Sequence, residues 1–177
     1  MKISAHSMTV ETFAPTLTSL VHVLDKAIQF AEAKKIDPSV LVNSRLAPDM
    51  YPLSIQVRIA CRYAKAATAL LSGKADPEID GALSTLAELR TYIEKTIAFV
   101  KTAKPSEFEG ADERDIVWPW FSNLEFAGKG GNYLKDWALP QFYFHVTTAY
   151  DILRHSGVAI GKRDYLGDVE SYIRPKT

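Results

Sequence analysis

The chain has 177 residues, of which 47% are hydrophobic and 24% charged, and its 21 lysine and arginine residues balance its 21 aspartate and glutamate residues. This length predicts one domain spanning residues 1–177, with a composition typical of soluble globular proteins. A formal net charge of zero argues against nucleic-acid binding and against a membrane surface held by basic residues, because both need excess positive charge.

The single cysteine, Cys61, excludes an intrachain disulfide and favours a reducing, cytoplasmic setting. We interpret it as a small buried hydrophobe, because it lies in a helical pattern with no base nearby in the sequence. The first residues do not form a signal peptide, since they include one lysine and no apolar run. No segment approaches the roughly 18 uninterrupted apolar residues that a membrane-spanning helix requires.

Four segments carry hydrophobic residues at steps of three and four, the period of an amphipathic α-helix. They are residues 9–34, 52–72, 83–103 and 132–156. A short helical turn is expected between the first two, because Asp37 can cap it and Pro38 suits its first position. Four such helices in one chain predict an all-α four-helix bundle.

Signals at the helix ends support these ranges. Thr85 and Glu88 form a capping-box pattern at the start of the third helix. Pro140 removes a backbone donor inside the fourth helix and should kink it. Gly157 should end that helix, and the residues after it predict an irregular tail with few core positions.

The linker of residues 73–82 joins the second and third helices. Fully extended, its ten residues span at most about 33 Å. A helix of twenty residues is about 30 Å long. The linker is therefore able to join the two helices as a hairpin or only just to cross the whole bundle.

Between the third and fourth helices the helical period stops, and hydrophobic residues alternate instead. The alternating residues are Ile116, Trp118, Trp120, Leu124 and Phe126. This predicts a β-hairpin over about residues 113–128, with its turn at 121–123 and Pro119 restricting it to an edge. The aromatic residues of VWPWF, which include Phe121, have two possible roles. They would form a lid over the bundle mouth or a dimer contact, or they would pack the hairpin on the open end of the bundle.

The fourth helix places polar residues on an apolar face. This face comprises Leu134, Trp137, Gln141, His145, Thr148 and Ile152. Gln56 lies on the inner face of the second helix, and burying such a His–Gln–Gln cluster without a use is costly. We therefore predict a polar ligand pocket lined by Gln56, Gln141, His145, Asp49, Tyr63 and Trp137. The alternatives are a neutral imidazole that hydrogen-bonds its neighbours, and an Asp49 that only caps a turn.

Three stretches resemble a bacterial family of domains of unknown function in the DinB/YfiT-like superfamily. They are SRLAPDMYPLSIQVRIACRYAK, TIAFV and YLKDWALPQFYFHVTTAYDILRHSGVAIGKRDYLG. The resemblance covers nearly the whole chain. It implies a DinB-like four-helix bundle with a small β-hairpin inserted between helices 3 and 4, in an up-down-down-up order that makes the 73–82 linker cross. It also implies a homodimer.

The superfamily's better-known members include metal-dependent enzymes and thiol transferases whose divalent metal is held by three histidines. One histidine comes from the second helix and two, four residues apart, come from the fourth. Carried over by position, these ligands fall at or near Gln56 and on Gln141 and His145. A glutamine carbonyl is a poor substitute for imidazole with zinc or nickel, so the resemblance implies a degenerate metal site. We expect no cofactor, with zinc or nickel as the weaker alternative.

Two functions stay open. The first is a dimeric, non-catalytic or ligand-binding domain with a polar pocket at Gln56, Gln141 and His145. The second is an enzyme that uses the pocket around His145, either of the metal-dependent hydrolase or thiol-transferase type or by metal-free acid–base chemistry. A cavity next to His145 lined by Tyr63, Trp137 or Tyr143 would favour the second.

Overall fold

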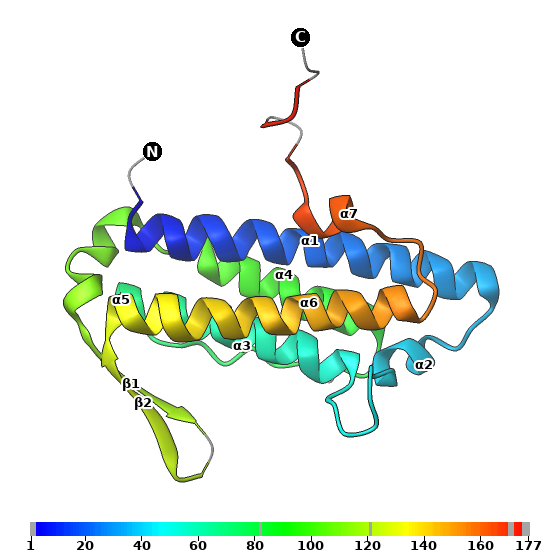
Figure 1. The fold of residues 1–177 in the computed structure, drawn as a ribbon, viewed down its shortest axis with the longest axis horizontal. Coiled ribbons are helices and arrows are strands. Elements are labelled where there is room, and N and C mark those ends of the chain that lie inside the picture. The colour runs from blue at the N-terminus through cyan, green and yellow to red at the C-terminus, as the bar shows by residue number, and fades with distance from the viewer. Residues whose placement is uncertain (1–2, 82, 121, 170–171, 175–177) are drawn as a thin grey trace.

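The computed structural model describes residues 3–81, 83–120, 122–169 and 172–174, and in it four long helices form a bundle (Figure 1). The long helices are α1 (Ala5–Lys34), α3 (Leu53–Ser72), α4 (Leu86–Val100) and α6 (Leu139–His155). The shorter elements are the helices α2 (Pro38–Asn43), α5 (Gly130–Asn132) and α7 (Lys162–Leu166), the 3-10 turns η1 (Pro105–Phe108) and η2 (Ala111–Glu113), the π-helical turn η3 (Tyr133–Ala138), and the strands β1 (Asp115–Trp120) and β2 (Leu124–Lys129). The predicted four-helix bundle with a small hairpin is confirmed.

The helices pair across the bundle rather than along the chain. α1 packs mainly on α4, and α3 packs mainly on α6. Nζ of Lys74, just after α3, lies 2.8 Å from Oε1 of Glu107, just after α4, so these two helices end at the same pole. The linker between them therefore runs back along the bundle (Figure 1), which is the crossing option.

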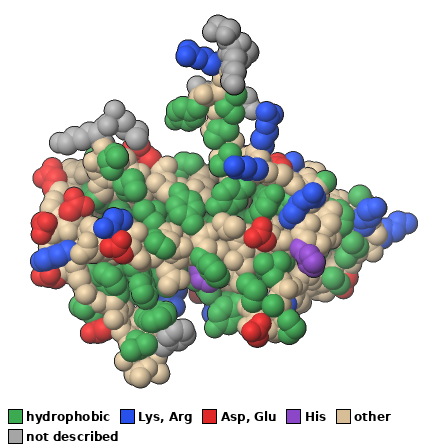
Figure 2. All heavy atoms as spheres, in the orientation of Figure 1, with side chains coloured by type: hydrophobic (Ala, Val, Ile, Leu, Met, Phe, Trp, Pro, Cys, Tyr) green, Lys and Arg blue, Asp and Glu red, His purple; other side chains and the backbone are tan. Residues whose placement is uncertain are grey.

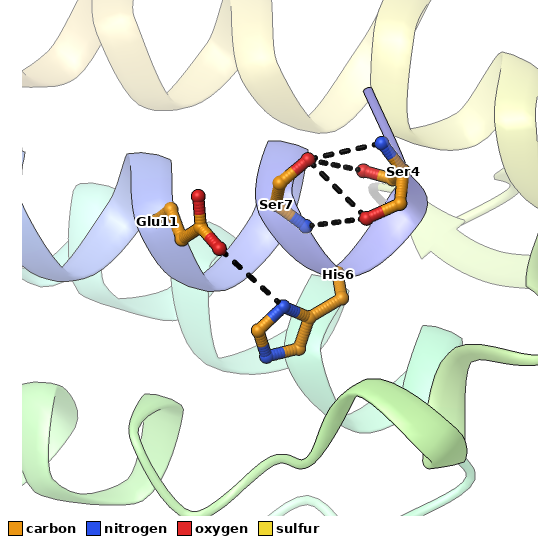
Figure 3. A network of polar contacts seen from close by, with 4 residues as sticks. All are labelled: Ser4, His6, Ser7 and Glu11. Carbon is orange, nitrogen blue, oxygen red and sulfur yellow. Dashed lines mark hydrogen bonds and ion pairs between the residues drawn. The ribbon is translucent and has the colours of Figure 1, made fainter. Parts of the chain in front are cut away.

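α1 begins at Ala5, four residues before the predicted start. Ser4 and Ser7 form a reciprocal cap, in which the Ser7 amide donates to Ser4 Oγ at 3.1 Å and the Ser4 amide donates to Ser7 Oγ at 3.0 Å (Figure 3). The His6 ring approaches Glu11 Oε1 at 3.8 Å and meets the Phe108 ring edge-on. These contacts fix the first turn, which has too few apolar residues to show a helical period.

The capping residues predicted for two other helices are confirmed. The Glu88 amide donates to Thr85 Oγ1 and the Thr85 amide donates to Glu88 Oε2, both at 3.1 Å. Because this box starts α4 at Leu86, the helix is shorter than the range 83–103 predicted for it. At α2, the Ser39 amide donates to Asp37 Oδ1 at 2.9 Å.

The predicted distortion at Pro140 takes the form of a π-helical turn. The amide of Leu139 donates to the carbonyl of Leu134, five residues earlier instead of four. A proline lacks the amide hydrogen and crowds the preceding turn, and a wider turn accommodates both effects. α5, η3 and α6 follow one another directly from Gly130 to His155, so the helix predicted over 132–156 is present with this wider turn near its start.

The hairpin is antiparallel, with Trp118 opposite Phe126 and Trp120 opposite Leu124. Its strands agree with the predicted range of 113–128, although Phe121 in the expected turn lies outside the described residues. β2 leads straight into α5 at Gly130, where a Cβ would lie 2.0 Å from the carbonyl oxygen of Ala111. A glycine is therefore needed for the hairpin to enter the bundle at this point.

The expectation of an irregular tail after Gly157 is wrong for its first part. Gly157 adopts φ +95° and the Val158 amide donates to the Leu153 carbonyl, which ends α6 as predicted. Val158 is fully buried, Ile160 is 4% exposed, and α7 packs on α1. Two apolar residues in a short loop show neither the helical nor the strand period. Sequence analysis therefore missed the packing of this segment on the bundle.

The bundle core is apolar and closely packed. Its largest fully buried side chains include Phe13, Leu17, Leu24, Leu53, Leu71, Leu89, Ile93 and Phe142. Cys61 belongs to this core at 1% exposure, and burial raises the pKa of its thiol to about 12, as expected for an inert hydrophobe. Across the described ranges, no helix combines the length and the apolarity needed to cross a membrane.

Candidate functional site

A cavity of about 430 Å³ lies between α3, α6 and the hairpin, and it brings together five of the six residues predicted for a ligand pocket. These five are Asp49, Gln56, Tyr63, Gln141 and His145. The remaining lining residues are Met50, Tyr51, Ile59, Arg62, Trp118, Pro119, Trp120 and Phe144. Five of the lining residues are exposed, namely Asp49, Tyr51, Arg62, Pro119 and Phe144, so the cavity reaches the molecular surface.

The centre of the site is a hydrogen bond between α3 and α6. Nδ1 of His145 lies 2.6 Å from Oε1 of Gln56, and both side chains are buried, at 8% and 2% exposure. Gln56 Nε2 in turn donates to the backbone carbonyl of Tyr51 at 3.0 Å, in the segment that leads into α3. Two helices and one loop therefore hold the imidazole in place.

This chain of hydrogen bonds decides the tautomer of His145. A backbone carbonyl only accepts, so the Gln56 group facing Tyr51 must be the amide nitrogen, and the group facing His145 must be the amide oxygen. His145 Nδ1 must then carry the hydrogen and donate it. The lone pair is left on Nε2, which has no hydrogen-bond partner among the described residues and is available to a molecule in the cavity.

The protonation state of His145 follows from its surroundings. Burial lowers its pKa from 6.5 to about 4, because the charged imidazolium is poorly solvated there. The ring is therefore neutral at pH 7. Tyr63 stacks with it at 6.4 Å between centroids with an interplanar angle of 11°, and Phe144 meets it edge-on at 5.2 Å. His145 thus presents a fixed, uncharged acceptor.

The structure places Trp137, the sixth predicted residue, outside the cavity lining. Its ring lies 5.0 Å from Trp120 and 5.8 Å from Phe126, beneath the hairpin. Trp137 lies in the π-helical turn, whose extra residue per turn rotates it away from the face that carries Gln141. Tyr143, also considered for the lining, is 39% exposed and lies outside the cavity.

Polar aromatic residues lie beneath the tryptophans that line the cavity. Tyr133 Oη and Trp137 Nε1 are buried without a hydrogen-bond partner among the described residues. Burial raises the pKa of Tyr63, and the positive charge of Arg62 reduces that rise. Trp118 and Trp120 therefore have two kinds of contact, since they line the cavity and also pack on Tyr133 and Trp137, respectively.

Arg62 is the charged lining residue that sequence analysis missed. Its Cζ lies 5.0 Å above the ring of Trp118, a cation–π contact that links α3 to β1. Because Arg62 is exposed and precedes the inward-facing Tyr63, its position on the helix suggested only a solvated face. The one signal in the sequence was the aromatic stretch VWPWF, because a cluster of aromatic rings needs a surface to pack against.

The residues at the three expected ligand positions do not fit a zinc or nickel site. Only His145 supplies an imidazole, and the Gln56 oxygen already accepts the hydrogen bond of that ring. Within the described ranges, no three His, Cys, Asp or Glu side chains are grouped closely enough to hold a metal ion. His22 and His155 are exposed, and His6 lies near the start of α1.

Comparisons with known proteins agree with this fold. The model of a family described as a domain of unknown function, DUF1993, matches residues 5–166. The chain is 41% identical to a DinB family member protein from Shewanella denitrificans, whose crystal structure it matches with a TM-score of 0.87 over 96% of this chain and 95% of that one. No curated protein matches it. The fold, the site and these matches together show that the chain belongs to the DUF1993 family, a family of domains of unknown function within the DinB-like superfamily.

Proposed function

We propose that this protein binds a small organic molecule in the cavity around His145 and does so without a metal ion. The observation that carries the proposal is the hydrogen bond from His145 Nδ1 to Gln56 Oε1. It holds a neutral imidazole rigidly and directs the free Nε2 lone pair to a ligand. A binding site gains affinity when its polar groups are held in place before the ligand arrives.

The size and lining of the cavity support this proposal. A volume of about 430 Å³ falls in the range of about 300–1,000 Å³ that small-molecule pockets occupy. Its walls combine aromatic side chains, namely Tyr51, Tyr63, Trp118, Trp120 and Phe144, with a few polar groups to orient a ligand. One of them is Gln141, whose half-buried amide has both a donor and an acceptor and no hydrogen bond to any described residue.

The donor set supports metal-independent binding. In a three-histidine site, the position of Gln56 would supply a ligand to the metal. Here the Gln56 side chain orients His145 instead, with its oxygen and its nitrogen both engaged. The degenerate metal site expected from the sequence would thus be reused as a hydrogen-bonding site.

Acid–base catalysis through Nε2 of His145 is the second candidate, and the cavity beside His145, which Tyr63 lines, is the feature that sequence analysis associated with an enzyme. The open position of Nε2 favours this role, since a general base needs a free lone pair facing the substrate. The pKa of about 4 opposes it, because a group with such a low pKa removes protons weakly at neutral pH. Binding without turnover is therefore the function we propose first.

The experiment has two parts, and the first measures metal content. Protein purified without a histidine tag or chelators should contain far less than one zinc or nickel per chain, and adding either ion should leave its thermal stability unchanged. Near-stoichiometric metal that is lost in His145→Ala would overturn the metal-free proposal.

The second part screens a fragment library by ligand-observed NMR. Fragments should bind the wild-type protein and His155→Ala, a control that removes an exposed histidine from the same helix, and should not bind His145→Ala. Fragments that bind all three proteins alike, or none that bind the wild type, would contradict a ligand site at His145.

Homodimerisation also stays a proposal. Figure 2 shows several patches of hydrophobic side chains on one face of the molecule, and Phe144 and Tyr51 near the cavity are 58% and 57% exposed. A second copy that covers such residues would make the site a shared one. Light scattering after size-exclusion chromatography would show a mass near twice that of one chain if this holds, and the mass of one chain if it does not.

A further inference from the structure

The cavity has a positively charged wall that the hydrogen bonds of His145 do not use. Arg62 lines the cavity, and its guanidinium has no carboxylate partner among the described residues. Arg90 on α4 differs, because it pairs with Asp25 at 2.7 Å and with Glu94 at 2.8 Å. Arg62 therefore keeps its hydrogen-bond donors for a ligand.

A contact with Trp118 limits where the Arg62 guanidinium lies. Its Cζ is 5.0 Å from the centre of the Trp118 ring, and its N–H groups make no hydrogen bond to a described residue. These donors match the two oxygens of a carboxylate in a bidentate arrangement. The contact also reduces the number of positions that the long side chain adopts, which lowers the entropy lost on binding.

Other lining residues of the cavity have the complementary chemistry. His145 Nε2 is an acceptor because the ring is neutral with its hydrogen on Nδ1. Asp49, also exposed at the cavity, is an acceptor as well. Arg62 follows Gln56, the partner of His145, by six residues on α3, which is a rise of about 9 Å along the helix axis, so the arginine and the Gln56–His145 pair come from different turns of α3.

We infer that the cavity selects an aromatic organic acid with a donor group at its far end. The inference rests on the proposed function, because it names the class of ligand for the same cavity. The carboxylate of the ligand pairs with Arg62, its ring contacts the aromatic walls that include Trp118 and Phe144, and its hydroxyl or amino group donates to His145 Nε2. Asp49 disfavours the reverse orientation, since it would repel the carboxylate.

Three probes of similar size test this inference. They are 4-hydroxyphenylacetate, its neutral amide 4-hydroxyphenylacetamide, and phenylacetate, which lacks the donor. In calorimetric titrations at pH 7.4 the hydroxy acid should bind the wild-type protein about tenfold or more tightly than the amide, because a charge-assisted hydrogen bond is lost in the amide. Phenylacetate should bind several-fold more weakly than the hydroxy acid.

Variants assign the selectivity to Arg62. Arg62→Leu should reduce the ratio of acid to amide affinity to about one, and Arg62→Lys should keep part of it, since the charge remains but the planar fork is lost. Arg58→Leu is the matched control, an exposed arginine one turn earlier on α3 that does not line the cavity, and it should keep the full ratio. Circular dichroism should show unchanged helix content in all three.

Failure of this inference differs from failure of the proposed function. If the acid and the amide bind equally and both lose affinity in His145→Ala, the cavity binds ligands without selecting acids, and the inference is overturned while the proposed function stands. A preference for the acid that persists in Arg62→Leu also overturns it. If none of the three probes binds, the ligand class is wrong, and the fragment screen alone decides the proposed function.

Discussion

The two helix pairs of this bundle differ in what they bury. Between α1 and α4 the buried part of the contact contains Leu17, Leu24, Leu89 and Ile93, which are all fully buried, while the Asp25–Arg90 ion pair lies at its exposed side. Between α3 and α6 the contact contains the buried Gln56–His145 hydrogen bond and opens into the cavity. The first pair resembles an ordinary bundle core, whereas the second accepts buried polar groups that need partners.

This difference indicates that one helix pair mainly stabilises the fold and the other forms the site. The α1–α4 pair supplies stability, because each buried aliphatic side chain adds transfer and packing free energy. The α3–α6 pair supplies the site. Elsewhere along α3 the buried side chains include the small residues Ala60, Ala64 and Ala67, which allow a neighbouring helix to approach closely. Substitutions in the first pair should change stability alone, and substitutions in the second should change binding as well.

The largest effect is expected for Leu89→Ala, which opens a cavity in the α1–α4 contact. We expect the free energy of unfolding to fall by about 2–5 kcal/mol, as measured by urea denaturation. The affinity for the acid probe should be unchanged under conditions where the variant is folded. Val40→Ala, at a 56% exposed position, is the control and should change stability little. If the variant lost ligand affinity in proportion to its loss of stability, the separate roles of the two helix pairs would be contradicted.

The next effect is a pH dependence due to His145. The unfolded ring takes up a proton below about pH 6.5, whereas the folded ring does so only near pH 4. Stability should therefore be complete above pH 6.5 and fall as the pH is lowered towards 4, by at most about 3 kcal/mol from this group. Urea denaturation at pH 7.5 and 4.5 measures the change. The loss of unfolding free energy between these two pH values should be smaller in His145→Gln by the contribution of His145. Equal losses in both proteins would show that His145 is not desolvated.

A smaller effect is expected for Gln56→Leu, which leaves the Nδ1–H of His145 and the Tyr51 carbonyl without partners. The loss should be about 1–3 kcal/mol, the usual cost of an unsatisfied buried polar group. Ring-nitrogen chemical shifts in ¹⁵N NMR should show the hydrogen on Nδ1 in the wild type and a mixture of tautomers in the variant. Gln29→Leu, on the exposed side of α1, should affect neither measurement. A wild-type ring with its hydrogen on Nε2 would contradict the hydrogen-bond assignment.

The smallest effect concerns the start of α4. Thr85→Ala removes the side-chain acceptor for the Glu88 amide and should cost about 1 kcal/mol without altering ligand affinity. Thr91→Ala, in the exposed interior of the same helix, is the control and should cost less. Equal losses in the two variants would show that the capping box contributes nothing beyond an ordinary threonine.

Sequence patterns predicted the long helices well because each has an apolar stripe with a regular period. They predicted the Gln56, Gln141 and His145 cluster because polar residues interrupt such stripes. They could not predict the position of Trp137, because a π-helical turn changes which residues share a helix face. Apart from Pro140, nothing in the spacing of the apolar residues indicates such a turn. Arg62 was missed for a different reason, because its role depends on a strand more than fifty residues later in the chain.

The crossing linker has a consequence for how this molecule folds. Both main helix pairs join segments far apart in the sequence, and the Gln56–His145 hydrogen bond spans 89 residues while the Asp25–Arg90 ion pair spans 65. A bundle of consecutive hairpins acquires its contacts locally and quickly, whereas a chain in this order must close long loops before it gains any of them. Refolding should therefore be slow for a helical protein of this length, and the hydrogen-bonded pair at the site, which closes the longer loop, should form among the last contacts.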